Sequence, residues 1–269
     1  YPATLSKHKF LPAWTAAGAG TNQVATGGGR VYATSGSGDN VAAVLSAYSL
    51  QSGQKLWATS MPPDSRINPP TFHRGRVYVQ RGHSPHDLRC FDAATGALQW
   101  TAPFDSQGGV YMAPGVDDTG VYINGGTHGG IYRFGFDGSQ IFFAHLEQVD
   151  RWTPLLHQGN VFSWVSSNFR KHDPASGMET SVVKLPGDNF YRGSVPAAEG
   201  NTAVMTDASK LIAVDLSTHR IRWELQKYTV GSPAIKNGIV YAMSTGAVES
   251  FDALTGAASV VYPVRTESG

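Results

Sequence analysis

The sequence repeats a pattern about every 40 residues, and this period constrains the fold more than any other feature of the chain. Each repeat opens with a glycine followed by β-branched or aromatic residues, as in Gly29-Arg30-Val31-Tyr32. A second element, clearest in Asp92-Ala93-Ala94-Thr95-Gly96, follows later in each repeat. Successive opening glycines are separated by 46, 45, 39, 41 and 38 residues, and they are Gly29, Gly75, Gly120, Gly159, Gly200 and Gly238. Two elements that recur together indicate one structural unit present six times.

Each repeat has the pattern of short β strands. Runs rich in Val, Ile and Tyr begin directly after the glycine turn, which predicts strands at residues 31–34, 77–80 and 239–243. The Asp-x-x-Thr-Gly element predicts a hairpin turn, because aspartate accepts hydrogen bonds from nearby backbone amides and glycine tolerates a positive φ. An outer strand that carries a tryptophan should follow this turn. The tryptophans in that position are Trp57, Trp100 and Trp223, and Trp14 fits the same pattern with no repeat before it.

Four-stranded units of about 40 residues are typical of a β-propeller. We therefore predict an all-β fold with four-stranded antiparallel blades, of which about six are visible. The chain would form a single domain over residues 1–269, with a spare outer strand near residues 10–17. The repeats are expected at about residues 22–66, 67–108, 109–152, 153–192, 193–230 and 231–265. Either six blades close into a ring, or the chain is part of a seven- or eight-bladed ring with further blades or flanking domains; we favour closure.

Several segments resemble the PQQ-type, or quinoprotein-like, β-propeller repeat. The resemblance is clearest in residues 46–57, 89–100 and 231–256, and it extends over about residues 10–264. It implies packing between blades by the tryptophan and the turn, and thus an architecture rather than a chemistry. The quinoprotein dehydrogenases of this repeat type use eight blades, a vicinal cysteine pair and calcium ligands, whereas this chain has one cysteine, Cys90, and six repeats. We therefore expect no cofactor and no metal site.

The charge balance argues against nucleic acid as a partner, and the length of the apolar stretches argues against a membrane span. The chain has 21 Lys and Arg against 20 Asp and Glu, so it lacks the basic excess of a dedicated nucleic-acid binder. No stretch approaches 18 uncharged apolar residues, which predicts no membrane span. Cys90 lies in an apolar run and is expected to be a small buried residue.

One face of a propeller carries the loops before each first strand and the loops between second and third strands. The candidate ligand-binding residues in these loops are Arg66, Arg81, Arg151, Trp152 and Arg192, and the same loop set contributes Asn124, His128, Asn168 and Arg170. Arginine pairs well with carboxylates and sulfates, and aromatic rings offer stacking surfaces. This face is therefore predicted to bind an acidic glycan or an acidic protein segment. Alternatively, these side chains bridge neighbouring blades through backbone carbonyls.

Two functions follow from this pattern. The first is a non-enzymatic binding or scaffold propeller, which the resemblance implies to be extracellular or periplasmic. The second is a carbohydrate-active enzyme, a polysaccharide lyase that acts on a uronate-containing polymer by β-elimination. In the lyase, the acid and base would come from His83, His128, Tyr111 and Tyr191. An arginine would neutralise the uronate carboxylate.

Overall fold

The structure is a computed structural model. It describes residues 13–16, 23–36, 38–64, 68–82, 84–108, 112–149, 151–186, 194–207 and 209–263. All the regular elements within these ranges are β strands. A helix that could cross a membrane is absent from this described part of the chain.

The strands form six four-stranded sheets, each antiparallel and each in chain order from the innermost to the outermost strand. The first sheet contains β1 (Ala25–Gly27), β2 (Arg30–Ser35), β3 (Gly38–Ser49) and β4 (Lys55–Asp64). The second contains β5 (Thr71–His73), β6 (Arg76–Gln80), β7 (Asp87–Asp92) and β8 (Leu98–Pro103). The third contains β9 (Gly115–Val116), β10 (Val121–Asn124), β11 (Gly130–Phe134) and β12 (Gln140–His145).

The second half of the chain continues the same arrangement. The fourth sheet contains β13 (Leu155–His157), β14 (Asn160–Val165), β15 (Asn168–His172) and β16 (Glu179–Lys184). The fifth contains β17 (Ala197–Glu199), β18 (Thr202–Thr206), β19 (Lys210–Asp215) and β20 (Arg220–Gln226). The sixth contains β21 (Val230–Lys236), β22 (Ile239–Ser244), β23 (Ala247–Asp252) and β24 (Ala258–Pro263). That residues 1–269 form one domain with the repeat limits given above stays a prediction.

The predicted Asp turn forms between the third and fourth strands of a sheet. Asp92 Oδ1 accepts hydrogen bonds from the backbone amides of Ala94 and Thr95 at 3.0 and 2.8 Å, and from the Thr95 hydroxyl at 2.8 Å. Gly96 closes the turn with a φ of 76°, in the region that favours glycine. The sequence pattern therefore marks the hairpin that joins β7 to β8.

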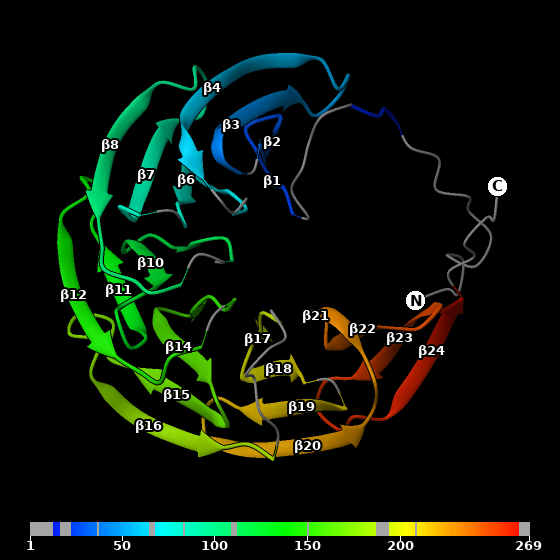
Figure 1. Cartoon of the computed structure of the whole chain (residues 1–269). Coiled ribbons are helices and arrows are strands. Elements are labelled where there is room, and N and C mark those ends of the chain that lie inside the picture. The colour runs from blue at the N-terminus through cyan, green and yellow to red at the C-terminus, as the bar shows by residue number, and fades with distance from the viewer. Residues whose placement is uncertain are drawn as a thin grey trace.

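The six sheets stand around a common axis as the blades of a propeller (Figure 1). Apolar clusters fill each junction between successive sheets. One of them packs Tyr78 and Leu88 of the second sheet against Val121 and Phe134 of the third. Cys90, fully buried in the same cluster, is the small core residue that its apolar surroundings predicted.

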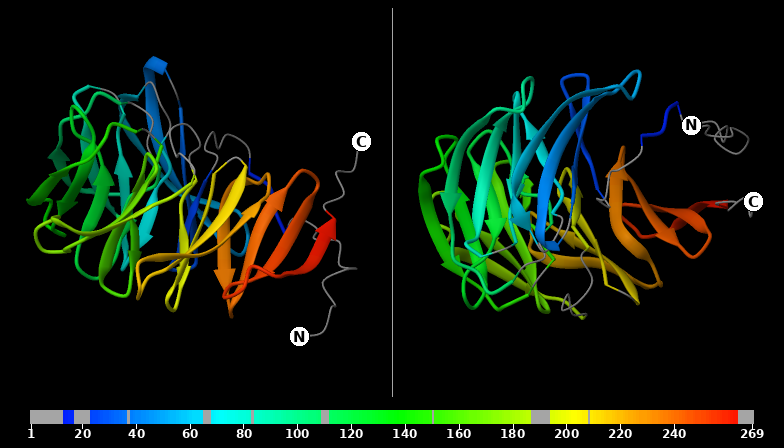
Figure 2. Two further views of the ribbon diagram at one scale, coloured as in Figure 1. Left: turned by 90° about the horizontal axis from the view of Figure 1, so that it is seen from below. Right: turned by 45° about the horizontal axis from the view of Figure 1, so that its top comes forward.

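The blades form an open arc rather than the closed ring that we favoured from the sequence. The first sheet, in blue, and the sixth, in orange and red, lie at the two ends of the arc (Figure 1). Within the described residues, the apolar clusters join each sheet to the next, and none joins the sixth sheet to the first. Figure 2 shows the same arc from two other directions, with the long β3–β4 hairpin projecting beyond its neighbours.

Tryptophans fasten one blade to the next, as the sequence predicted. The indole Nε1 of Trp57 on β4 donates to the carbonyl of Ala93 in the turn of the second sheet at 3.2 Å. Trp100 and Trp223 make the equivalent bonds to the third and sixth sheets at 2.8 and 3.0 Å. Trp14 donates to the Leu50 carbonyl of the first sheet at 3.0 Å, so it takes the place of a tryptophan from a preceding blade.

Candidate functional site

Polar residues at the loop ends of the second strands bridge neighbouring blades. The Thr34 hydroxyl donates to the Asn68 carbonyl at 2.8 Å, and the Asn68 side-chain amide donates to the Gln80 carbonyl at 3.0 Å. The Gln80 side-chain amide then donates to the Asn124 carbonyl at 2.6 Å. All four residues are buried. This row links the first three sheets, and Asn124, one of the predicted loop residues, takes part in it through its backbone carbonyl alone.

Arg81 also forms an ion pair and a hydrogen bond within the protein. It is 3% exposed, pairs with Asp87 at 2.6 Å and donates to the Pro63 carbonyl at 3.0 Å. Arg89 pairs with the other oxygen of the same carboxylate at 2.8 Å. Arg81 therefore ties the start of β7 to the end of β4, and its predicted role in ligand binding stays a prediction.

The other predicted site residues have different surroundings. Arg151 is exposed, with a φ of 61°, whereas Trp152 is 2% exposed and packs with Tyr122 and Ile131 between the third and fourth sheets. His128 is exposed in the turn between β10 and β11. Five of the predicted residues, Arg66, His83, Tyr111, Tyr191 and Arg192, lie outside the described residues. The predicted set as a whole is therefore not tested, and the acidic ligand and the lyase chemistry stay predictions.

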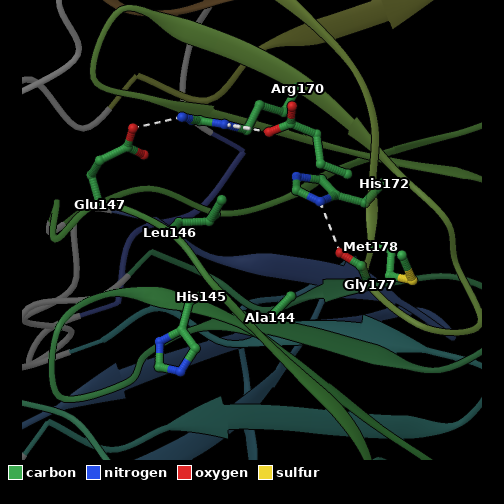
Figure 3. A pocket seen from close by; sticks show the side chains of 9 residues that line it. Ala144, His145, Leu146, Glu147, Arg170, His172, Gly177 and Met178 are labelled. Carbon is green, nitrogen blue, oxygen red and sulfur yellow. Dashed lines mark hydrogen bonds and ion pairs between the residues drawn. The ribbon is translucent and has the colours of Figure 1, made fainter.

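A pocket of about 570 Å³ lies between the outer strands of the third and fourth sheets (Figure 3). Residues at the end of β12 form one wall, and residues of β15 and the start of β16 form the other. The lining residues are Ala144, His145, Leu146, Glu147, Arg170, His172, Gly177, Met178 and Glu179.

Arg170 is the centre of the pocket. Its Nη2 pairs with Glu147 Oε1 at 2.6 Å, and its Nε pairs with Glu179 Oε2 at 2.9 Å. Its Nη1 donates to the Val165 carbonyl at 3.4 Å. The arginine side chain is 10% exposed, while the side chains of Glu147 and Glu179 are 45% and 46% exposed. A buried cation thus holds two carboxylates at the pocket mouth.

The protein keeps Glu147 ionised. Partial burial acts to raise its pKa, but hydrogen bonds from its own backbone and from Arg170 outweigh burial, so the pKa lies below its usual value. The Asn168 side-chain amide also donates to Glu147 Oε1 at 3.4 Å. The pocket mouth therefore carries a charged carboxylate at neutral pH.

His172 forms the floor beside Arg170 and is almost completely buried. Its Nδ1 lies 3.1 Å from the Gly177 carbonyl, which can only accept, so Nδ1 carries the proton. Its Nε2 then accepts from the Ser163 hydroxyl at 2.8 Å. Burial lowers the pKa of His172, mainly because a charged imidazole would lose its hydration. The ring is therefore neutral at physiological pH.

The sequence contained a signal for this site. In the fifth sheet, the strand positions that face the preceding blade carry Met205, Ile212 and Val214. The equivalent positions of the fourth sheet carry Ser163, Arg170 and His172. Sequence reasoning named Arg170 as a loop residue but missed Glu147, Glu179 and Met178. The second and sixth sheets also carry charged residues at the Arg170 position, Arg89 and Glu249, so the signal lay in Ser163 and His172, whose equivalents in those two sheets are apolar.

A family model described as outer membrane protein assembly factor BamB matches residues 4–101, 41–160 and 166–261. The chain belongs to this BamB-like family. The resemblance to PQQ-type propeller repeats and the all-β propeller fold are therefore confirmed. Among curated proteins, none matches the sequence significantly.

Solved structures with a similar fold include a BamB protein, a designed protein and a quinohemoprotein dehydrogenase. BamB from Moraxella catarrhalis has a TM-score of 0.67 at 15% identity over 89% of this chain and 73% of its own. The computationally designed Ika8 protein has a TM-score of 0.69 at 15% identity, with the same coverage. Quinohemoprotein alcohol dehydrogenase from Comamonas testosteroni has a TM-score of 0.67 at 12% identity over 90% of this chain and 59% of its own. At these identities the likeness concerns the fold alone.

The residues of this BamB-like chain do not fit the quinone-binding pattern of the dehydrogenases that share the repeat. Its single cysteine, Cys90, is fully buried between the second and third sheets. A vicinal cysteine pair therefore cannot form within these 269 residues.

Proposed function

We propose that this chain is a non-enzymatic scaffold that binds segments of other proteins outside the cytoplasm, in the extracellular space or the periplasm. The observation that carries the proposal is the family match, which extends over most of the chain and whose description names an assembly factor for outer membrane proteins. An assembly factor acts by holding other chains, so a binding role follows from family membership more directly than a catalytic one.

The hydrogen bonding of the described polar residues supports this proposal. Arg76 donates to the Phe136 carbonyl at 2.7 Å and Arg133 donates to the Pro174 carbonyl at 2.6 Å, each across a junction between blades. Arg81 is paired with Asp87. Arginines that bond neighbouring blades make the propeller rigid. A rigid, preformed surface loses little conformational entropy when it binds a partner.

The loop face is the first surface that we assign to this function. Arg151 is exposed, and it belongs with Arg66 and Arg192 to the set that the sequence predicts for this face. We propose that these arginines pair with carboxylates of an acidic protein segment, because guanidinium groups form two parallel hydrogen bonds to a carboxylate.

The test is the affinity of the purified chain for a fluorescent, extended peptide that alternates Glu and Thr, compared with a peptide in which Gln replaces Glu. Arg151→Ala should weaken binding of the acidic peptide about three-fold, as expected for one exposed ion pair. Arg220→Ala, at another exposed arginine, on β20, is the control and should leave the affinity unchanged. Equal affinity for the Glu and Gln peptides, or equal loss in both variants, would reject the loop face as the binding surface.

A further inference from the structure

We propose that the pocket between the third and fourth sheets binds a lysine or arginine side chain of an extended protein segment. This inference rests on the proposed function as a binding scaffold and adds a second surface with the opposite charge preference. It is carried by the charges at the pocket mouth, by the apolar wall and by the placement of polar residues in a blade junction.

The charges at the mouth favour a cation. Two glutamates share the single positive charge of Arg170, which leaves one negative charge in excess. The Arg170 donors already face Glu147, Glu179 and the Val165 carbonyl, so an incoming anion would have to displace a carboxylate. Within the described residues, Oε1 of Glu179 has no hydrogen-bond donor. A basic side chain would supply that donor and neutralise the excess charge.

The wall of the pocket suits a long aliphatic stem. Ala144 and Leu146 are partly buried on the side of the third sheet, and Met178 is 70% exposed on the side of the fourth. Lysine and arginine bury their methylene groups on apolar surface and keep the charged end in a polar environment. Methionine adapts to different partners because its side chain is unbranched and flexible. The pocket therefore offers contacts to both parts of a basic side chain.

A bare metal ion is a poorer occupant. Among the described residues, no group of three potential ligands from His, Cys, Asp and Glu lies close enough to hold one. Figure 3 shows the Arg170 guanidinium directed at Glu147, so a metal bound to that carboxylate would lie beside a fixed positive charge.

The position of the polar residues also favours a bound partner. Ser163 and His172 occupy strand positions that carry Met205 and Val214 in the fifth sheet, and Val79 and Phe91 in the second. Buried polar and ionic groups contribute less to stability than apolar residues of similar size, and sites that break the local pattern are often functional. A binding pocket explains why this junction is polar.

The experiment measures fluorescence anisotropy of a labelled peptide, Thr-Val-Thr-Lys-Thr-Val-Thr, with the purified full chain. Two companion peptides replace Lys by norleucine or by Glu. We expect saturable binding of the Lys peptide and affinity at least about ten-fold lower for norleucine, because a hydrogen bond between charged groups is lost. Any binding of the Glu peptide should be unaffected by Glu179→Gln, because the loop face and not the pocket would hold it.

Variants assign the binding to the pocket. Glu179→Gln should weaken the Lys peptide about ten-fold and leave the norleucine peptide unchanged. Glu224→Gln is the matched control: Glu224 also lies on an outer strand, pairs with Lys210 and has a side chain that is 42% exposed, and its change should have no effect. Met178→Lys places an internal ammonium at the mouth and should abolish binding of the Lys peptide. Thermal unfolding of each variant verifies that the fold is kept.

The outcomes separate this inference from the loop-face proposal. Equal binding of the Lys and norleucine peptides, or a loss with Glu224→Gln equal to that with Glu179→Gln, overturns the pocket assignment. Binding of acetyl-lysine amide as tight as that of the peptide overturns the protein-segment assignment in favour of a free amine. Self-association that Met178→Lys removes overturns it in favour of a second copy of the chain. If the Arg151-dependent acidic peptide still binds in these cases, the scaffold function survives; if neither peptide binds, both proposals fail.

Discussion

Single residues fasten the blades together through a contact between a tryptophan and a glycine. The Trp57 ring lies against Gly96 of the next sheet, and a Cβ on Gly96 would come within 2.6 Å of that ring. Gly75 has nearly the same φ, 77° against 76°, but a Cβ there would meet no atom within 4 Å. Gly75 therefore reports the cost of a side chain at positive φ alone, whereas Gly96 adds the clash with the tryptophan ring.

Alanine substitutions at the two glycines test this distinction. Gly75→Ala should lower the free energy of unfolding by about 1 kcal/mol, because alanine is strained at positive φ. Gly96→Ala should lower it by about 2 kcal/mol more, because the new methyl group clashes with Trp57. Chemical denaturation measures both values, and equal losses would show that the tryptophan contact contributes nothing.

His172 makes stability depend on pH. Its pKa is lowered in the folded protein because burial disfavours the imidazolium, so the unfolded chain binds the proton more readily. Between the folded-state pKa and about 6.5, the unfolded pKa, stability should therefore rise with pH and fall on acidification. His219 has the same direction of shift, caused first by burial and then by Lys171, and adds to the effect.

His172→Phe tests the contribution of this histidine. The substitution places a residue that cannot be protonated in the position that Phe91 and Phe251 occupy in other repeats. The difference in denaturation midpoint between pH 7.5 and pH 5.5 should be smaller than in the original chain, whatever the change in stability at pH 7.5. A difference as large as that of the original chain would assign the pH dependence to other groups.

At the scale of elements, the Asp turn organises the hairpin at the outer edge of a blade. In the second sheet, hydrogen bonds to the Thr95 side chain and backbone lower the pKa of Asp92, although slight burial opposes them. Asp173 and Asp252 likewise accept hydrogen bonds from the backbone amides two and three residues further along the chain. The backbone amides of the turn are therefore bound by its own aspartate, while Trp57 of the preceding sheet bonds the Ala93 carbonyl of the same turn.

Removing one such carboxylate should destabilise the chain measurably. Asp92→Ala should lower the free energy of unfolding by about 1 kcal/mol, since it leaves the turn amides without their acceptor. Asp118→Ala is the control, because Asp118 is 64% exposed and, among the described residues, pairs only with Arg74 and His73, and each such exposed pair is worth less than about 0.5 kcal/mol. Urea denaturation distinguishes the two, and a loss for Asp118 as large as that for Asp92 would contradict this account of the turn.

The elements could be predicted from the sequence because their signals are local. A glycine before an apolar run marks the start of a second strand, and an aspartate four residues before a glycine marks the turn between the third and fourth strands. Each signal therefore lies within a single hairpin. The strands β6 and β22 fall where the glycine signal predicted them. The pocket could not be predicted in the same way, because Glu147 and Glu179 belong to different blades and meet only through Arg170. The strand face to which Arg170 belongs depends on the register of β14 and β15, which the sequence pattern did not specify.

At the scale of the whole molecule, the arc gives the end blades fewer neighbours than the middle ones. All five residues of β18 in the fifth sheet are buried, whereas β22 in the sixth sheet includes Met243, which is 48% exposed. Apolar packing on both faces slows the local opening that amide exchange requires. The sixth sheet should therefore be the less protected of the two.

Hydrogen exchange followed by mass spectrometry tests this difference. Peptides that cover β22 should exchange faster than peptides that cover β18 in the same sample. Both strands are second strands of their blades and pair on both sides, so they make a matched comparison. Equal protection would indicate that the sixth sheet is covered in solution.

The central claim, that this propeller is a scaffold with two charge-selective surfaces, is tested most directly by selection from a random heptapeptide library displayed on phage. The account predicts two enriched classes, one acidic and one basic. Arg151→Glu should remove the acidic class alone, and Glu179→Gln should deplete the basic class alone. No enrichment of either class, or enrichment that both variants leave unchanged, would contradict the claim.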